Sequence, residues 1–467
     1  MFRKPIDLAW QHNLPELFVN SVFNATYLLL LSSAGLIAQE NAAAIEQQAI
    51  GLIQSGEFTT ATKLLVKTVE RYPNKANFWN LLGIADTETG EFTRARSAFE
   101  KGLALAPHST DLNENMGLLF FRKADYGAAK TYLAAAVTLG SEKPGVRFSL
   151  AAAKLRTGAP AEGLEELKAL EPALSGNSEY WEERGRAEFI VDLANAGASF
   201  DRALTLSPNN VQALNEAAAA AEKQGLDEKA LAYLIRARAV APDDVSTLLH
   251  LGTVCIRRDL GLDARDALQR AYQLQPSNNA AVYLLARANV SLQNWQQAFD
   301  LFEEVSRRAP QFAPAYYAIG WLDVRLNRLE DARKYLKRAL ALDPSLSGAR
   351  YELAQLDFDD GKLDSAERLL GTDLSRTAED SKSKVLLADI LMRKGKLDEA
   401  EKLLTAAVQQ EPALAAAHYK LSILLLKKNE PEQAEREKNI AANLASSATQ
   451  ASKTQLKLLL PETENVR

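Results

Sequence analysis

The fold of this chain is decided by residues 79–107, which read WNLLGIADTETGEFTRARSAFEKGLALAP. Apolar residues recur at helical spacing in the first part of this stretch, from Trp79 to Ala85. A glycine turn follows, and Ala95 and Phe99 then lie four residues apart, on one face of a second helix. The stretch therefore predicts two short helices joined by a tight turn.

This two-helix pattern recurs with a period of 34 residues, and Leu248–Pro276 and Tyr316–Pro344 keep its internal spacing. One position of the first helix is small in twelve successive units: Ala49, Gly83, Gly117, Ala151, Gly185, Ala218, Gly252, Ala286, Gly320, Ala354, Ala388 and Ser422. One position of the second helix is alanine in all units but one: Ala61, Ala95, Ala129, Gly163, Ala196, Ala230, Ala264, Ala298, Ala332, Ala366, Ala400 and Ala434. Helix backbones approach closely only where no bulky side chain separates them, so both series predict helix–helix contacts.

The ends of the helices carry signals of their own. A residue that tolerates the left-handed conformation follows the first helix in eight units: Gly56, Gly90, Gly158, Gly225, Gly361, Gly395, Asn327 and Asn429. Proline cannot continue a helix, and it closes eight units: Pro73, Pro107, Pro208, Pro242, Pro276, Pro310, Pro344 and Pro412. Each unit is therefore expected to end in a corner that leads into the next.

These units resemble the tetratricopeptide repeat family, whose motif is most complete from Trp79 to Pro107. The resemblance covers about Asn41 to Ser446. It implies an all-α fold, a right-handed superhelical solenoid of about twelve helix pairs, whose first helices line a concave groove that binds peptides or partner proteins. The units from Pro144 and near Ser178 depart from the motif, and Lys438 in the last unit suits a terminal repeat with a solvated outer face.

Composition excludes several other classes of protein. The 467 residues include one cysteine, Cys255, and four scattered histidines, so neither a disulfide framework nor a multi-cysteine metal site is expected. Fifty-five basic against 60 acidic residues give no overall nucleic-acid signature. No nucleotide fingerprint, nucleophile elbow or metalloprotease motif is present, so we expect no cofactor and no enzymatic activity. An acidic cluster at Asp357–Asp364 is interpreted as a solvated turn rather than a calcium site.

The chain is expected to begin with an export segment, residues 1–38, followed by the repeat array, residues 39–446, and a frayed tail, residues 447–467. Arg3 and Lys4 precede an uncharged run from Leu17 to Gln39. That order favours a signal peptide cleaved before Gln39. Two alternatives stay open: an uncleaved membrane anchor and a buried helix. The first two interpretations both predict a periplasmic, secreted or membrane-anchored body outside the cytoplasm.

A series of aromatic residues on the first helices is the first candidate for partner binding. In the family, this face lines the concave groove. The alternative is that the rings only pack between neighbouring first helices, because large rings with a polar tip serve both purposes. We favour groove lining for Tyr283, Arg287, Tyr317, Trp321, Tyr351, Phe358 and Tyr419.

A basic series at the ends of the first helices is the second candidate. Cations at a helix C-terminus are favoured by the helix dipole, and this explains the pattern without a partner. The position also reaches the groove rim in the family, so an acidic partner segment remains the alternative. The series, here called the basic ridge, comprises Arg122, Arg156, Lys223, Arg257, Arg325, Arg393 and Lys427.

Together these patterns predict an exported scaffold that holds a segment of another protein in its groove for assembly. The alternative is a regulatory or substrate-presenting subunit of an envelope enzyme or assembly machine. Contact with a membrane is expected only through an uncleaved N-terminal segment.

Overall fold

A computed structural model describes the backbone of residues 33–374 and 380–455 and the side chains of residues 42–372 and 380–446. Within these residues every regular element is an α-helix and no strand occurs. The chain divides into two compact units, residues 1–220 and 221–467, and helix α11 crosses the division. The all-α fold predicted from the 34-residue period is therefore confirmed.

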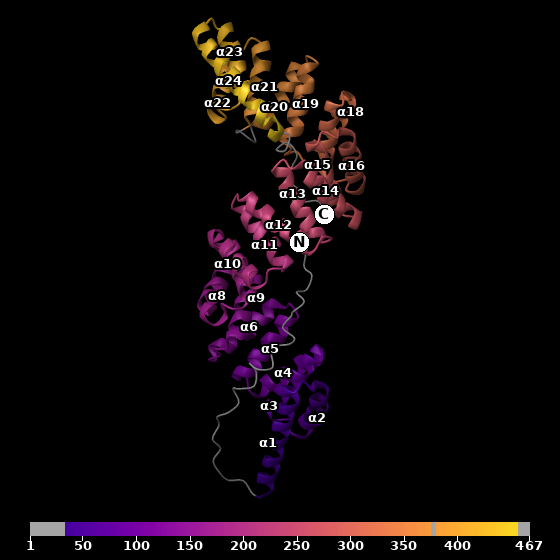
Figure 1. The fold of residues 1–467 in the computed structure, drawn as a ribbon, viewed down its shortest axis with the longest axis vertical. Helices are drawn as coiled ribbons and strands as arrows, with labels where there is room; N and C mark the ends of the chain where they lie inside the picture. Colours follow the sequence, from indigo (N-terminus) through magenta and orange to yellow (C-terminus); the bar gives the residue numbers. More distant parts are fainter. Residues whose placement is uncertain (1–32, 375–379, 456–467) are drawn as a thin grey trace. The chain divides into compact units, whose positions relative to one another are not determined.

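Helices follow one another in pairs along each unit (Figure 1). The helices up to the division are α1 (Ser33–Gln54), α2 (Phe58–Arg71), α3 (Ala76–Glu88), α4 (Phe92–Leu105), α5 (Thr110–Arg122), α6 (Tyr126–Thr138), α7 (Pro144–Arg156), α8 (Pro160–Leu174), α9 (Ser178–Val191), α10 (Leu193–Leu206) and α11 (Val211–Lys223). The later helices are α12 (Asp227–Val240), α13 (Val245–Arg257), α14 (Gly261–Leu274), α15 (Asn279–Ser291), α16 (Trp295–Arg308), α17 (Ala313–Arg325), α18 (Leu329–Leu342), α19 (Ser347–Asp359), α20 (Leu363–Leu374), α21 (Ser381–Arg393), α22 (Leu397–Gln410), α23 (Ala415–Lys427) and α24 (Pro431–Gln455). Odd numbers are the first helices of their pairs and even numbers the second.

The small positions of the repeat lie where the two helices of a pair touch. All twelve first-helix positions are buried, and the second-helix alanines are almost completely inaccessible to solvent. A methyl group on Gly320 would lie 2.7 Å from the Leu336 side chain, so the α17–α18 contact leaves no room for it. The predicted packing reason for these positions is confirmed.

Turns and corners also follow the sequence signals. The eight predicted turn residues all have positive φ, between 57° and 82°. Ala124, Asp259 and Gln293 adopt the same conformation in units that lack a glycine or asparagine there. Each predicted corner proline lies two residues beyond the end of a second helix, as Pro107 does after α4.

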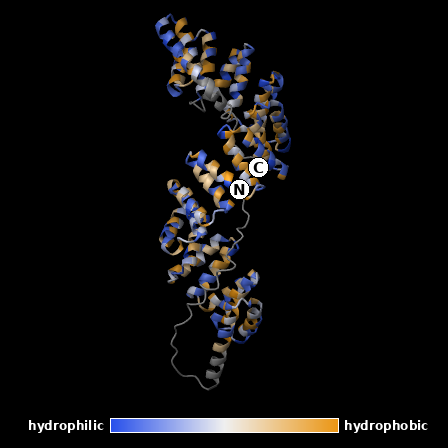
Figure 2. Ribbon diagram, viewed as in Figure 1, coloured by the Kyte–Doolittle hydropathy of each residue, from blue (hydrophilic) through white to orange (hydrophobic). Residues whose placement is uncertain are grey.

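The hydrophobic core is a series of clusters, each shared by neighbouring pairs. Each helix shows hydrophobic and hydrophilic residues side by side (Figure 2). One cluster joins α15 to α19 through residues such as Phe302, Ile319 and Leu353. Because each pair buries its apolar face against the next, stability is distributed along the array.

The predicted bounds of the array lie inside helices or outside the described residues. Helix α24 continues to Gln455, past the predicted end of the array at Ser446. The predicted cleavage point at Gln39 lies within α1, while most of the predicted export segment and the last part of the tail fall outside the described residues. Among the helices that are described, none combines the length and the apolar character needed to cross a membrane.

Candidate partner-binding surface

The predicted exposed aromatic stripe is not present at its central positions. Tyr283, Tyr317 and Trp321 are almost fully buried, and Phe358 is 5% exposed. These rings occupy the alternative position considered from the sequence, packed between helices. Neighbouring first helices contact one another directly, as α13 does α15 and α17 does α19, so they cover the face that was expected to be open.

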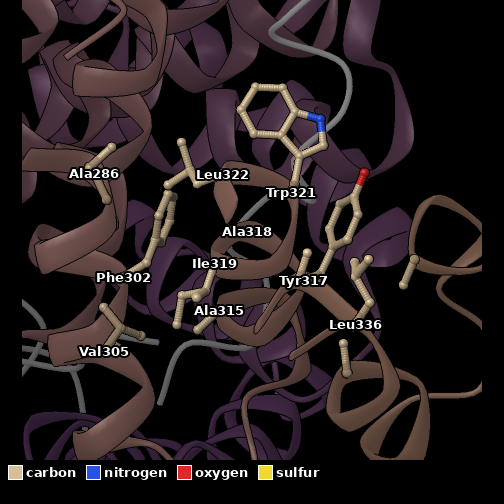
Figure 3. Packing of buried hydrophobic residues seen from close by; sticks show 14 of the residues in the cluster. Ala286, Phe302, Val305, Ala315, Tyr317, Ala318, Ile319, Trp321, Leu322 and Leu336 are labelled. Atoms are coloured by element: carbon tan, nitrogen blue, oxygen red, sulfur yellow. The ribbon is translucent and has the colours of Figure 1, made fainter. Parts of the chain in front are cut away.

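The α17 rings show this packing most clearly. Tyr317 and Trp321 lie one turn apart on one side of their helix, while Ile319 and Leu322 extend toward Phe302 on the other (Figure 3). The Tyr317 ring lies so close to α19 that a methyl group on Gly348 would meet its hydroxyl.

Burial changes the polar atoms of these rings. It raises the pKa of the Tyr283 and Tyr317 hydroxyls well above the usual range. The Trp321 indole nitrogen is buried without an acceptor among the described residues.

The remaining residues of the aromatic series have mixed environments. Tyr283 packs edge-on against Phe302 and Phe312, with ring centroids 5.4 and 5.3 Å away. Arg287 is buried and Tyr351 is half-buried, whereas Tyr419 is 53% exposed. Tyr419 is therefore the one residue of the series with a largely open ring.

All seven members of the basic ridge lie in the last turn of a first helix, where the dipole favours a cation. Three of them also form ion pairs with a neighbouring unit. Arg122 pairs with Glu88 at 2.6 Å, Arg156 pairs with Glu183 at 2.5 Å, and Arg257 pairs with Glu222. These three residues therefore connect neighbouring 34-residue repeats, and their charges are already paired.

Arg325 and Arg393 are held differently. The Arg325 guanidinium stacks 3.1 Å from the centroid of the Trp321 ring, and Arg393 lies 3.7 Å from that of Phe358. Among the described residues neither forms an ion pair within 4 Å; Arg325 donates only to the Trp321 carbonyl. Burial lowers the pKa of Arg325, although Glu352 opposes this. Lys223 and Lys427 are exposed.

A polar network on the first helices of unit 1–220 was not foreseen. Glu183 accepts from Arg156 and from Arg186, and Arg186 also pairs with Glu216 at 2.8 Å. Burial acts to raise the pKa of Glu183, but the two guanidinium groups outweigh it and lower the pKa. Burial raises the pKa of neighbouring Glu182 to about 7. Arg186 occupies the repeat position of Trp321, so the 34-residue register could have located it.

Carboxylates of the acidic cluster form ion pairs, and the cysteine is buried. Asp357 is buried and pairs with Arg333 at 2.5 Å, and Asp364 pairs with Lys394 at 2.6 Å, so cations already neutralise these carboxylates. Asp357 thus differs from the solvated turn that was expected. Cys255 is buried, and burial raises the pKa of its thiol to about 11.

Comparisons with known proteins decide the family. Tetratricopeptide repeat models match residues 46–110, 262–312, 323–390 and 391–439. A TPR repeat-containing protein of Pseudomonas aeruginosa is 36% identical over 76 residues, which cover 16% of this chain and 72% of that protein. This chain belongs to the tetratricopeptide repeat family. Such folds are typical of protein–protein interaction scaffolds.

Other relatives match only in part. Protein FlbA of Caulobacter vibrioides is 31% identical over 190 residues, which cover 40% of this chain and 31% of FlbA. The TPR protein YrrB, whose structure is described as having an unusual peptide-binding site, covers 39% of this chain and 95% of its own, with 20% identity and a TM-score of 0.37. Yeast Tom70 covers 90% of this chain and 96% of its own, with 16% identity and a TM-score of 0.43.

Proposed function

We propose that this tetratricopeptide protein is an exported scaffold that holds an acidic segment of a partner protein along the first helices of unit 221–467. The observation that carries the proposal is the pair of ring-stacked guanidinium groups, Arg325 and Arg393. Both residues are exposed, and among the described residues no carboxylate lies within 4 Å of either guanidinium, so an incoming carboxylate can form a charge-assisted hydrogen bond with each.

The arrangement of charge along the basic ridge supports a segment with spaced acidic residues. Arg325, Asp359 and Arg393 occupy the same repeat position on α17, α19 and α21. Asp359 accepts from Gln355 at 3.0 Å and is exposed. The complementary partner therefore carries carboxylates opposite the two arginines and none opposite Asp359. Ring stacking holds each guanidinium plane before the partner arrives, which lowers the ordering cost of binding.

The role of the aromatic residues changes in this proposal. Trp321 and Phe358 position the guanidinium groups from beneath, and exposed Tyr419 offers an apolar contact further along the same series. Export is proposed from the basic start and the uncharged run of Leu17–Gln39.

The test is partner capture with the purified full chain, followed by affinity measurement with synthetic segments of any captured protein. The double variant Arg325→Gln, Arg393→Gln is expected to weaken binding at least tenfold, which needs only about 1.4 kcal/mol. The matched control is Arg307→Gln, Lys402→Gln, which removes two exposed cations from second helices and should bind as the parent does. Unchanged affinity in the ridge double variant, with an unchanged melting temperature, would refute the proposal.

A further inference from the structure

A cavity lies between second helices α12 and α14 at their corner with α13. It has a volume of about 670 Å³. Its apolar lining includes Ile235, Leu248 and Ala267, and its charged lining includes Arg238 and Arg270. A volume of this size is typical of pockets that bind small groups.

At the cavity, α12 carries a charged residue where most second helices are apolar. One period away from Arg238, most other second helices carry an apolar residue that is buried or packs against the core: Val69, Leu103, Val137, Leu204, Tyr272, Leu340 and Val408. Glu171 on α8 and Ser306 on α16 are polar at this position, as Arg238 is on α12. In the next second helix, Tyr272 packs there and donates its hydroxyl to Glu304 at 3.2 Å. An aromatic ring therefore fits the spacing of these helices, and α12 does not supply one.

The position of Ile235 shows the opposite change. Ile235 is 46% exposed, whereas six other second helices have a polar or charged residue one period away: Glu100, Lys168, Asp201, Gln269, Glu303 and Lys337. Val66 on α2 and Ala134 on α6 are apolar at this position, and Val66 is also exposed. On α12 the polarity of two positions three residues apart is thus exchanged. As a result, the exposed apolar side chain of Ile235 and the guanidinium of Arg238 both line the cavity.

The charges around the cavity are balanced except at Arg238. Asp243 pairs with Arg270 at 2.7 Å, and Asp266 pairs with Arg265 at 3.2 Å. Within the described part of the chain, Arg238 has no carboxylate at ion-pair distance. An occupant that brings one carboxylate to this guanidinium would complete the local balance.

We propose that this cavity binds an aromatic side chain of a partner protein that carries a carboxylate beside it. The ring would occupy the place that Tyr272 fills one unit later, against Leu248 and Ala267, and the carboxylate would pair with Arg238. The site lies on other helices than Arg325 and Arg393, which are on α17 and α21, and does not depend on the function proposed for them.

The probe is 3-phenylpropionate, which joins a ring to a carboxylate, with 3-phenylpropylamine as its cationic counterpart. Saturation-transfer NMR on the full chain should detect the carboxylate binding at least tenfold more tightly than the amine. Arg238→Leu introduces the apolar residue found in most other repeats, so it should fold, close the cavity and remove binding. Ala239→Leu fills the cavity from an exposed position and should remove binding with Arg238 still present.

Two controls complete the test. Arg236→Leu makes the same change of charge on the same helix outside the cavity lining and should bind as the parent does. The double variant Arg325→Gln, Arg393→Gln should also bind normally, which separates this site from the basic ridge. Equal binding of the two probes, or normal binding in the folded Ala239→Leu variant, would overturn the proposal.

Discussion

The electrostatic environment of a buried carboxylate on the first helices depends on whether a cationic side chain lies close to it. Asp86, Glu188, Asp323 and Asp357 occupy the same repeat position, and all are buried. Asp86 pairs with Arg94 at 2.8 Å, and Glu188 pairs with Arg184 at 2.9 Å. At Asp323 the nearest cation, Arg328, is 3.8 Å away, and neither carboxylate oxygen has a hydrogen-bond partner among the described residues.

The environment of Asp323 leads to a prediction with a definite sign. Burial raises its pKa from 3.8 to about 6; Arg328 opposes this, and Asp331 and Glu303 add to it. A raised carboxyl pKa means that the folded state binds more protons, so this group lowers stability as pH rises from about 4 through 6. Asp323→Asn should therefore raise the free energy of unfolding at pH 7 by about 1–3 kcal/mol, with a smaller gain at pH 5. Denaturant titrations of the parent and the variant at pH 5 and pH 7 measure this difference in the free energy of unfolding.

The matched control for this prediction is Asp357→Asn. This carboxylate lies at the same repeat position but accepts from Arg333 and from Ser365. Removing its charge leaves a guanidinium without its buried partner, so the variant should lose stability at pH 7. A loss of stability in both variants would contradict the prediction, because it would mean that the folded protein stabilises the negative charge of Asp323.

At the scale of the helices, sequence spacing predicted the pairs, turns and corners because those depend on residues close in the chain. The positive φ of Gly225 and the position of Pro242 after α12 are local properties. Burial of Tyr283 and Trp321 depends instead on helices from neighbouring units, which periodicity alone does not place. The partners of Arg156 and Arg257 likewise lie 27 and 35 residues away, beyond the reach of local pattern.

The contact between paired helices gives a prediction at this scale. Ala332 on α18 is completely buried at the small second-helix position. Ala332→Leu should force the α17–α18 pair apart and lower the free energy of unfolding by about 1–3 kcal/mol. Ala232→Leu makes the same substitution at an exposed position of α12 and should change it by less than about 0.5 kcal/mol. Equal stability of the two variants, measured by chemical denaturation, would place the helix contact elsewhere.

Across the whole molecule, the first helices carry different chemistry in the two units. In unit 1–220 the face is polar and already hydrogen-bonded, as in the pairing of Asn115 with Asn80 at 2.9 Å and of Arg186 with Glu216. In unit 221–467 the repeat position of Asn80 holds Tyr283, Tyr317 and Tyr351, and that of Arg186 holds Trp321 on α17. Guanidinium groups stack on Trp321 and on Phe358. Because satisfied polar groups gain little from a new partner, the proposed recognition of an acidic segment belongs to unit 221–467.

Export also concerns the whole chain, and it can be tested without knowing the partner. Arg3 and Lys4 before the uncharged run predict that everything after Gln39 leaves the cytoplasm. A reporter that is active only outside the cytoplasm, fused to the end of the full chain, should be active, and the same fusion without residues 2–38 should be silent. Cleavage before Gln39 would leave residues 39–54 of α1, a longer helix than α3, so the first repeat would keep both its helices. The mass of the mature protein then separates the two routes, since a start at Gln39 means cleavage and an intact Met1 means an anchor. A stable full-length fusion without reporter activity would contradict export and leave a cytoplasmic scaffold in its place.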